Sequence, residues 1–115
     1  MRSDGEKLLD ILEATDRIER YMVFGRERFE RDELVQTWFV QNLQIIGEAC
    51  RSLSQNTRDL APTIPWKQII GMRNILAHTY FDIDFDIVWT AVSVNIPQLR
   101  LQINQLLREI DLSAD

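Results

Sequence analysis

The chain has 115 residues, of which 45% are hydrophobic and 27% are charged, and its formal net charge at pH 7 is −5. This length is sufficient for one domain, and the composition is ordinary for a soluble globular protein. No apolar run approaches the ~20 residues that cross a bilayer, so no membrane association is expected. The negative net charge excludes binding to long nucleic acid by bulk attraction, and no DNA partner is expected.

The amino terminus and the cysteine content favour a cytoplasmic location. The first residues lead directly into an amphipathic pattern and lack the apolar core and the cleavage site of a signal peptide. The single cysteine, Cys50, excludes an intramolecular disulfide framework. Because Cys50 lies in a stretch with apolar periodicity, it is interpreted as a small core residue rather than as a nucleophile.

Residues at helical intervals predict a first and a second helix. Ser3 and Glu6 have the spacing of a capping box at the start of the first helix, which continues to Met22 and stops near Gly25. The second helix is expected to begin near Asp32. Its broad inner stripe consists of Val35, Trp38, Phe39, Asn42, Ile45, Ile46, Ala49 and Leu53.

The segment from Ser54 to Pro65 is polar and holds two prolines, which predicts a loop. Pro65 suits the first turn of a third helix that continues toward His78. Asp82 and Asp84 supply capping acids for a fourth helix. The inner face of this helix consists of Val88, Trp89, Val92, Ile96, Leu99, Ile103, Leu106 and Ile110.

Pro97 lies inside the fourth predicted helix, where it removes a backbone donor and crowds the preceding turn. We expect a kink just before Pro97 rather than an interruption of the chain. No alternating strand pattern, internal repeat or second domain is found. The sequence therefore predicts one all-α domain, residues 1–115, folded as an antiparallel four-helix bundle with the fourth helix kinked at Pro97.

The basic residues are unevenly distributed, because eleven of the thirteen are arginine. One interpretation of a cluster in the first third of the chain is a solvated face interleaved with glutamates. The other is a local patch that binds an anion or a partner, since arginine makes forked contacts with phosphate. The cluster consists of Arg17, Arg20, Arg26, Arg28 and Arg31.

Residues 73–80 hold the only histidine of the chain, with an arginine five positions before it and a tyrosine two positions after it. On a straight helix, Arg73 and His78 are about 140° apart around the axis and ~7.5 Å apart along it, whereas Asn74 and His78 share one face. Arg73 and His78 could meet if the helix ended near Ala77. Alternatively, a second copy of the chain in a two-fold dimer could complete the site.

The residues of this segment suit cleavage of RNA without a metal or another cofactor. One histidine and one cysteine at unrelated positions do not form a zinc ligand set, and no nucleophile for a catalytic triad is identified. His78 could remove the proton of a 2′-hydroxyl or protonate the leaving oxygen. Arg73 could stabilise the charge of the phosphorane, and Asn74 could orient the imidazole or bind a phosphate oxygen. Tyr80 could stack on a base.

A plainer interpretation of the same residues stays open on geometry alone. A single histidine near a helix end is more often a cap or a hydrogen-bonded core residue. Asn74 would then be a polar residue of the helix surface, and Tyr80 an ordinary buried aromatic residue. The three tryptophans are interpreted as core or interface residues rather than as platforms that stack on a ligand.

The spacing Arg73-x4-His78-x-Tyr80 resembles the signature of the HepT-like branch of the HEPN (higher eukaryotes and prokaryotes nucleotide-binding) superfamily. The surrounding sequence is also similar to that family over nearly the whole chain. The similar stretches are Ile46-Gly47-Glu48-Ala49, Pro65-Trp66, Ile70-Gly71-Met72-Arg73-Asn74, Ile83 through Trp89, and Pro97 with Leu99.

The resemblance implies a function that the spacing does not give. HepT-like proteins are helical homodimers that act as ribonuclease toxins of type VII toxin–antitoxin systems, with the motif at a cleft between protomers. It implies that Arg73 and His78 are the catalytic pair and that Asn74 accompanies them. It also implies a cognate nucleotidyltransferase antitoxin that attaches AMP to Tyr80, where the added phosphates would occupy the anion site and repel RNA.

Two other functions stay open. The chain could be a non-catalytic partner subunit that binds a nucleotide or positions a substrate for a nucleotidyltransferase, with Arg73 and His78 binding a phosphate. It could also be a purely structural bundle. RNA cleavage by this acidic chain requires local positive potential, which Arg73 could supply together with some of the arginines between positions 17 and 31.

Overall fold

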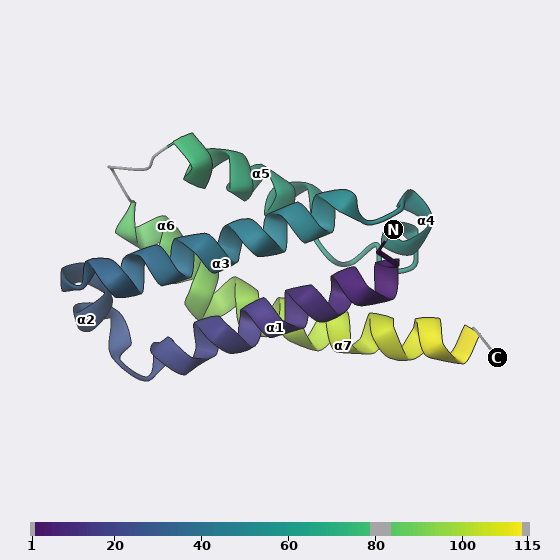
Figure 1. Cartoon of the computed structure of the whole chain (residues 1–115), viewed down its shortest axis with the longest axis horizontal. Helices are drawn as coiled ribbons and strands as arrows, with labels where there is room; N and C mark the ends of the chain where they lie inside the picture. Colours follow the sequence, from purple (N-terminus) through teal and green to yellow (C-terminus); the bar gives the residue numbers. More distant parts are fainter. Residues whose placement is uncertain (1, 79–83, 114–115) are drawn as a thin grey trace.

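The computed structural model describes the backbone of residues 2–78 and 84–113, and the side chains of these ranges except those at 73–75, 77–78 and 112–113. Within these ranges the chain is helical and contains no strand (Figure 1). In chain order the helices are α1 (Asp4–Met22), α2 (Gly25–Arg31), α3 (Glu33–Ser52), α4 (Gln55–Asp59), α5 (Trp66–His78), α6 (Phe85–Thr90), the π-helical η1 (Ala91–Asn95) and α7 (Ile96–Ser113).

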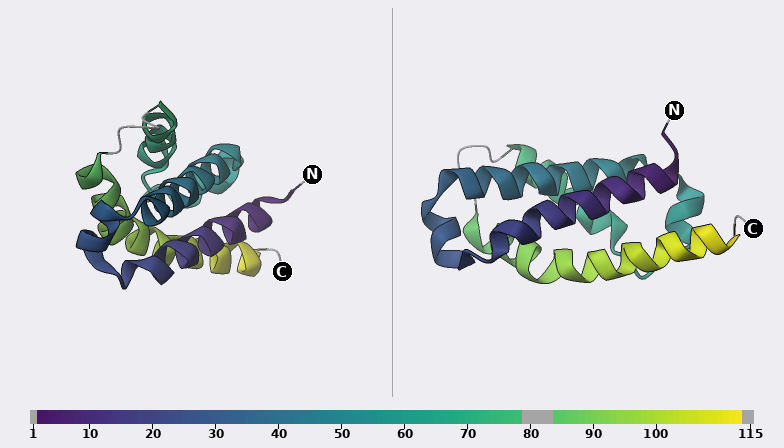
Figure 2. Two further views of the ribbon diagram at one scale, coloured as in Figure 1. Left: turned by 60° about the vertical axis from the view of Figure 1, so that its left-hand side comes forward. Right: turned by 60° about the horizontal axis from the view of Figure 1, so that its bottom comes forward.

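Helix α3 lies in the middle of an elongated bundle, which measures 49 × 27 × 25 Å. It packs against α1 on one side and against α5 on the other, and α1 packs against α7 (Figures 1 and 2). The carboxyl end of α5 lies with α2 and α6 at one end of the bundle. The two chain termini and α4 lie at the other end. The prediction of an all-α bundle is confirmed.

Three helices begin at polar residues whose side chains cap their amino ends. The Ser3 hydroxyl accepts from the Glu6 amide at 3.1 Å at the start of α1. The Asp32 carboxylate accepts from the Leu34 amide at 3.0 Å at the start of α3. Asp84 begins α6 in the same way, accepting from the amide three residues later at 3.1 Å. These local hydrogen bonds satisfy amides that have no partner inside the helix.

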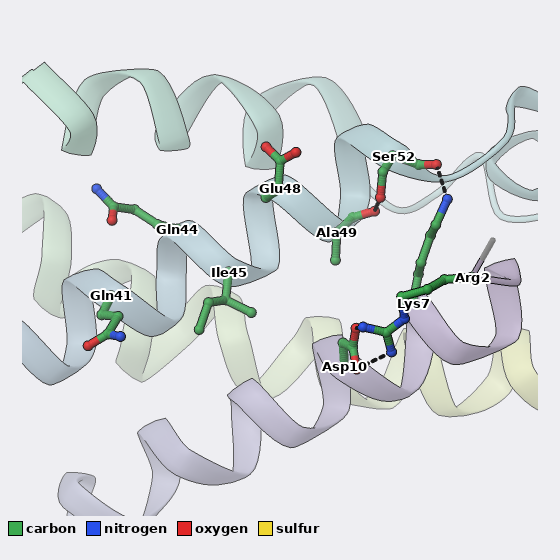
Figure 3. A pocket seen from close by; sticks show the side chains of 9 residues that line it. All are labelled: Arg2, Lys7, Asp10, Gln41, Gln44, Ile45, Glu48, Ala49 and Ser52. Carbon is green, nitrogen blue, oxygen red and sulfur yellow. Dashed lines mark hydrogen bonds and ion pairs between the residues drawn. The ribbon is translucent and has the colours of Figure 1, made fainter.

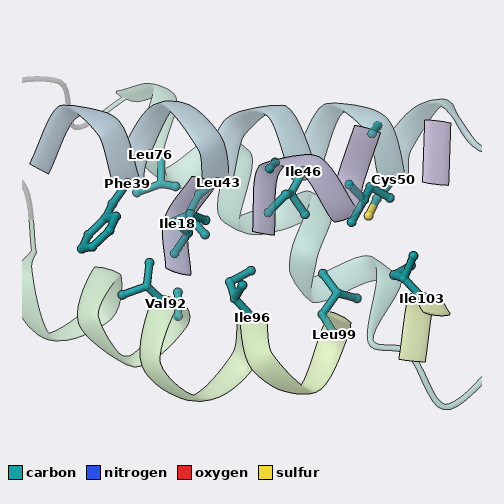
Figure 4. Packing of buried hydrophobic residues seen from close by; sticks show 14 of the residues in the cluster. Ile18, Phe39, Leu43, Ile46, Cys50, Leu76, Val92, Ile96, Leu99 and Ile103 are labelled. Atoms are coloured by element: carbon teal, nitrogen blue, oxygen red, sulfur yellow. The ribbon is translucent and has the colours of Figure 1, made fainter. Parts of the chain in front are cut away.

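The core is a continuous set of aliphatic and aromatic side chains from α1, α2, α3, α5, α6, η1 and α7. Figure 4 shows how side chains of α3 meet those of η1 and α7 across it, with Leu76 of α5 above Leu43. Trp38 ties α3 to α1, because its indole Nε1 donates to the Arg17 carbonyl at 2.9 Å. The interpretation of the tryptophans as core residues holds for Trp38, Trp66 and Trp89, which all pack against the core.

Two short helices were not predicted. Helix α2 follows the predicted stop at Gly25 and is held by Phe29, which is fully buried. Helix α4 lies inside the segment predicted as a loop, so that prediction was wrong for residues 55–59. Its first turn is held by Asp4 of α1, whose carboxylate accepts from the Ser54 and Thr57 hydroxyls at 2.6 Å each. Both helices depend on contacts between distant segments, which local periodicity does not report.

The fourth predicted helix consists of α6, η1 and α7 in direct succession. The irregularity lies just before Pro97, as predicted, and takes the form of a π-helical turn in which the Ile96 amide donates to the Ala91 carbonyl. Pro97 cannot donate, and its ring crowds the preceding turn. The Ser93 hydroxyl donates to the Trp89 carbonyl at 2.6 Å, which further disturbs the regular ladder. A wider turn accommodates both effects.

None of the helices in the described ranges has the length and apolar content that spanning a membrane requires.

Candidate active site

Helix α5 carries three of the four predicted site residues on one stretch of helical backbone. Arg73 and Asn74 lie in its middle, and His78 is its last residue. Tyr80 lies outside the described residues. The structure therefore brings Arg73, Asn74 and His78 to the carboxyl half of a single helix, where the sequence analysis expected them.

The buried residue Leu76 fixes the orientation of α5. Its side chain is 5% exposed and faces the core. At 100° per residue, positions 74 and 78 lie about 160° around the helix from position 76, and position 73 lies about 60° from it. Positions 74 and 78 therefore belong to the side of α5 away from the core. Position 73 belongs to its flank.

The outer side of α5 is not covered by another helix of the described chain. Helix α5 packs mainly on α3, and Figure 2 shows it at the margin of the bundle. His78 is the last residue of α5 and lies on helical backbone, one position beyond the helix end that was expected near Ala77. The separation of about 140° between positions 73 and 78 therefore remains. An uncovered face with this separation suits a site that a second copy of the chain completes.

The segment that carries Tyr80 leads into a firmly held helix. Arg26 of α2 forms an ion pair with Asp86 of α6, and its Nε lies 3.4 Å from a Glu30 carboxylate oxygen. An aromatic cluster centred on Phe29 lies beneath. The ring centroids of Phe39, Phe85 and Trp89 are 5.5, 5.4 and 5.8 Å from that of Phe29. These contacts hold the amino end of α6 against α2 and α3.

Most of the predicted arginine patch is neutralised by carboxylates. Arg17 pairs with Glu13 at 2.7 Å, and Arg28 pairs with Asp32 at 2.7 Å. Arg26 is held by its two acidic neighbours as described above. Within the described chain only Arg20 and Arg31 of this group have no ion pair. The arrangement favours a solvated, interleaved face over a patch that binds phosphate.

Two hollows on the surface differ in whether their Arg and Lys side chains are already engaged by other residues of the chain. The hollow between α1 and α3, about 580 Å³, contains Arg2 and Lys7, but both are engaged within the chain (Figure 3). Arg2 pairs with Asp10 at 2.7 Å, and Lys7 Nζ donates to the Ser52 carbonyl at 2.7 Å. The hollow between α4 and α5, about 530 Å³, contains Arg58 and Lys67. Neither of these two forms an ion pair with any described residue.

This second hollow was not predicted. Arg58 lies in the segment that was predicted as a loop, and Trp66 and Lys67 follow Pro65 at the start of the third predicted helix. One available signal was the spacing of Lys67 from Asn74 and His78, which is seven and eleven residues and marks one helix face. The contribution of Arg58 depends on α4, which no local pattern predicted.

Cys50 does not contribute to the described site. Burial raises the pKa of the Cys50 thiol to about 12, although the nearby Arg58 charge opposes this shift. The thiol is therefore protonated at neutral pH and acts as a core residue. Among the residues that the structure describes, no group of three His, Cys, Asp or Glu side chains is placed to hold a metal ion.

Comparison with known families identifies the class of protein to which this chain belongs. The sequence model of the family described as "Ribonuclease HepT-like" matches residues 11–106. The chain therefore belongs to the HepT-like ribonuclease family of HEPN proteins.

Individual relatives agree with this family. A Methanocaldococcus jannaschii protein named as a candidate RNase is 36% identical over 97 residues, which cover 84% of this chain and 89% of the relative. A Caldanaerobacter subterraneus subsp. tengcongensis protein, also named as a candidate RNase, is 37% identical over 80% of this chain and 82% of its own length. A Thermococcus cleftensis protein named "Probable ribonuclease HepT" is 35% identical over 91% and 96%. No solved structure gives a significant match.

Proposed function

We propose that this protein is a metal-independent endoribonuclease and the toxin of a type VII toxin–antitoxin system, acting in the cytoplasm as a homodimer. Membership of a ribonuclease family supports RNA as the substrate. The observation that carries the proposal is that α5 presents positions 74 and 78 on a side that no helix of the described chain covers. A charged substrate and a second copy can both reach this side.

The proposed reaction requires one proton acceptor and one proton donor. His78 of one copy removes the proton of the 2′-hydroxyl, and O2′ attacks the adjacent phosphorus. The P–O5′ bond breaks, and the leaving oxygen takes a proton from the partner's His78. The products carry a 2′,3′-cyclic phosphate and a 5′-hydroxyl. Arg73 stabilises the additional negative charge of the phosphorane, and Asn74 holds a phosphate oxygen or the imidazole.

Tyr80 provides the proposed control of the activity. A cognate nucleotidyltransferase antitoxin transfers AMP to its hydroxyl, two residues after His78. The added phosphates carry negative charge close to the anion site and repel the RNA backbone.

The test is RNA cleavage in the presence of excess chelator. The parent protein is expected to cleave RNA, and Arg73→Ala and His78→Ala are expected to lower the rate at least ~100-fold, the typical effect of losing an acid–base or charge-stabilising group. Arg108→Ala serves as the matched control, because Arg108 is an exposed arginine on α7 without an ion pair in the described chain. Circular dichroism checks that each variant is folded.

Equal cleavage by the parent and by His78→Ala would contradict the proposal. If neither protein cleaves RNA but both bind a nucleotide in an Arg73-dependent manner, the non-catalytic partner subunit becomes the better explanation. Incubation with the nucleotidyltransferase and ATP tests the control. A mass increase of one or more AMP units in the parent, absent in Tyr80→Phe, is expected together with loss of cleavage by the modified parent only.

A further inference from the structure

The hollow between α4 and α5 combines charge with an aromatic surface. Its lining includes Gln55, Arg58, Asp59, Trp66 and Lys67. Two of these residues are cations and one is a carboxylate, so the lining is net positive in a chain whose net charge is −5. Such a local excess of positive charge is what an acidic protein needs in order to hold a phosphate.

The two cations are available for a ligand. Lys67 is exposed and Arg58 is half-buried, and neither forms an ion pair with a described residue. The carboxylate in the lining, Asp59, accepts from the Gln55 amide at 2.7 Å and pairs with neither cation. The hollow between α1 and α3 differs because its Arg2 and Lys7 are engaged within the chain.

Trp66 gives the hollow a fixed aromatic surface. Its indole Nε1 donates to the carbonyls of Arg58 and Ala61, each at 3.1 Å, so the ring cannot turn freely. The side chain is half-buried against the core and also lines the hollow. A ring held in this way offers a face on which an unpaired base can stack without an ordering cost for the protein.

The hollow and the motif lie along the same side of α5. Position 67 is within about 20° of positions 74 and 78 around an ideal helix. It lies about 16 Å from position 78 along the axis, a distance that a few nucleotides of single-stranded RNA span. Gly71 lies between them, where an added Cβ would have no heavy atom of the described chain within 4 Å. The space beside Gly71 is therefore open.

From this arrangement we infer that the hollow between α4 and α5 binds a nucleotide of the single-stranded RNA substrate, a few positions from the bond to be cleaved. Arg58 and Lys67 hold its phosphate, and its base stacks on Trp66. The inference rests on the proposed ribonuclease function. It locates in this hollow the positive potential that RNA binding needs. That potential comes from α4 and α5 rather than from the arginines between positions 17 and 31, most of which are paired.

The test measures binding of a 2′-O-methyl oligoribonucleotide, which lacks the attacking hydroxyl, at several salt concentrations. Lys67→Gln is compared with Arg108→Gln, which removes the same charge from an exposed position on α7. Loss of one phosphate contact lowers the slope of log affinity against log salt by about 0.7 and weakens binding about fivefold at 0.1 M salt. This change is expected for Lys67→Gln and not for Arg108→Gln.

A second measurement locates the base. An oligoribonucleotide that contains 4-thiouridine is irradiated with the protein, and the crosslinked tryptic peptides are identified by mass spectrometry. The peptide of residues 59–67, which contains Trp66, is expected to carry the crosslink. Crosslinks confined to other peptides, or equal slopes for Lys67→Gln and Arg108→Gln, would overturn the inference.

The measurements separate this inference from the proposed function. Binding to the 2′-O-methyl RNA requires no cleavage, so a Lys67-dependent slope in a protein that cleaves nothing would support the nucleotide site and reject the ribonuclease. Cleavage that is unaffected by Lys67→Gln, with unchanged RNA binding, would reject the site alone. If Lys67→Gln changes only the mass measured by light scattering, the hollow is an interface between copies and the inference fails.

Discussion

At the scale of one residue, α5 differs from an ordinary surface helix because it holds a glycine, Gly71, in its interior. Glycine inside a helix costs about 1 kcal/mol relative to alanine, because it loses more backbone entropy on folding. Nothing within the described chain requires its missing side chain, since an added Cβ would meet no heavy atom within 4 Å. The residue is therefore unfavourable for the helix of the isolated fold.

Gly71→Ala is expected to raise the free energy of unfolding by roughly 1 kcal/mol, because the helix gains propensity without a clash. Urea denaturation of the parent and the variant, measured at the same low protein concentration, checks this value. The same variant is expected to bind RNA more weakly or to dimerise less. A destabilised Gly71→Ala protein would show that position 71 is already in close contact within the fold.

At the scale of elements, Asp4 joins α1 to α4 and so supports one wall of the α4–α5 hollow. Its side chain is 24% exposed and accepts from the Ser54 and Thr57 hydroxyls at 2.6 Å. Burial alone would raise the pKa of Asp4, but these hydrogen bonds and the Lys7 charge bring it below its ordinary value. The charged form is therefore favoured by folding.

Asp4→Asn is expected to lower the free energy of unfolding at pH 7 by about 1 kcal/mol, because hydrogen bonds to a charged group are replaced by neutral ones. Since the folded pKa is depressed, the stabilisation is complete above the unfolded pKa of about 3.9 and is lost as the pH falls through the folded value. Chemical denaturation at pH 7 and below pH 3 tests this dependence. A difference that is equal at both pH values would contradict the electrostatic explanation.

The helix boundaries show which elements local sequence determines. Ser3, Asp32 and Asp84 are caps whose hydrogen bonds reach only two or three residues along the chain, so their positions could be predicted. Pro97 likewise acts on its own preceding turn. Helices α2 and α4 could not be predicted, because Phe29 and the Asp4–Thr57 contact stabilise them across long sequence separations.

At the scale of the whole molecule, the separation of Arg73 and His78 on α5 leads to a prediction about subunit composition. If both histidines of a dimer serve one composite site, a dimer with one parent chain and one His78→Ala chain lacks an acid or a base. Its activity is expected to fall at least ~100-fold, far below half of the parent activity. Two different affinity tags allow the mixed dimer to be purified and assayed.

A mixed dimer with half of the parent activity would instead show two independent sites. A protein that stays monomeric at micromolar concentration while cleaving RNA would reject the shared site outright. A mixed dimer of the parent and Arg108→Ala, which changes an exposed arginine on α7, serves as the control and is expected to keep full activity.

The sequence alone determined the class of fold and the motif. Helical periodicity, caps and the Arg73–His78 spacing are local or one-dimensional properties, and the family comparison confirms the HepT-like assignment. Only the tertiary structure decided which cations stay free, because ion pairs such as Arg26–Asp86 join residues sixty positions apart. It also formed the hollow beside α5, since Arg58 of α4 and Lys67 of α5 line the same hollow only in the folded chain.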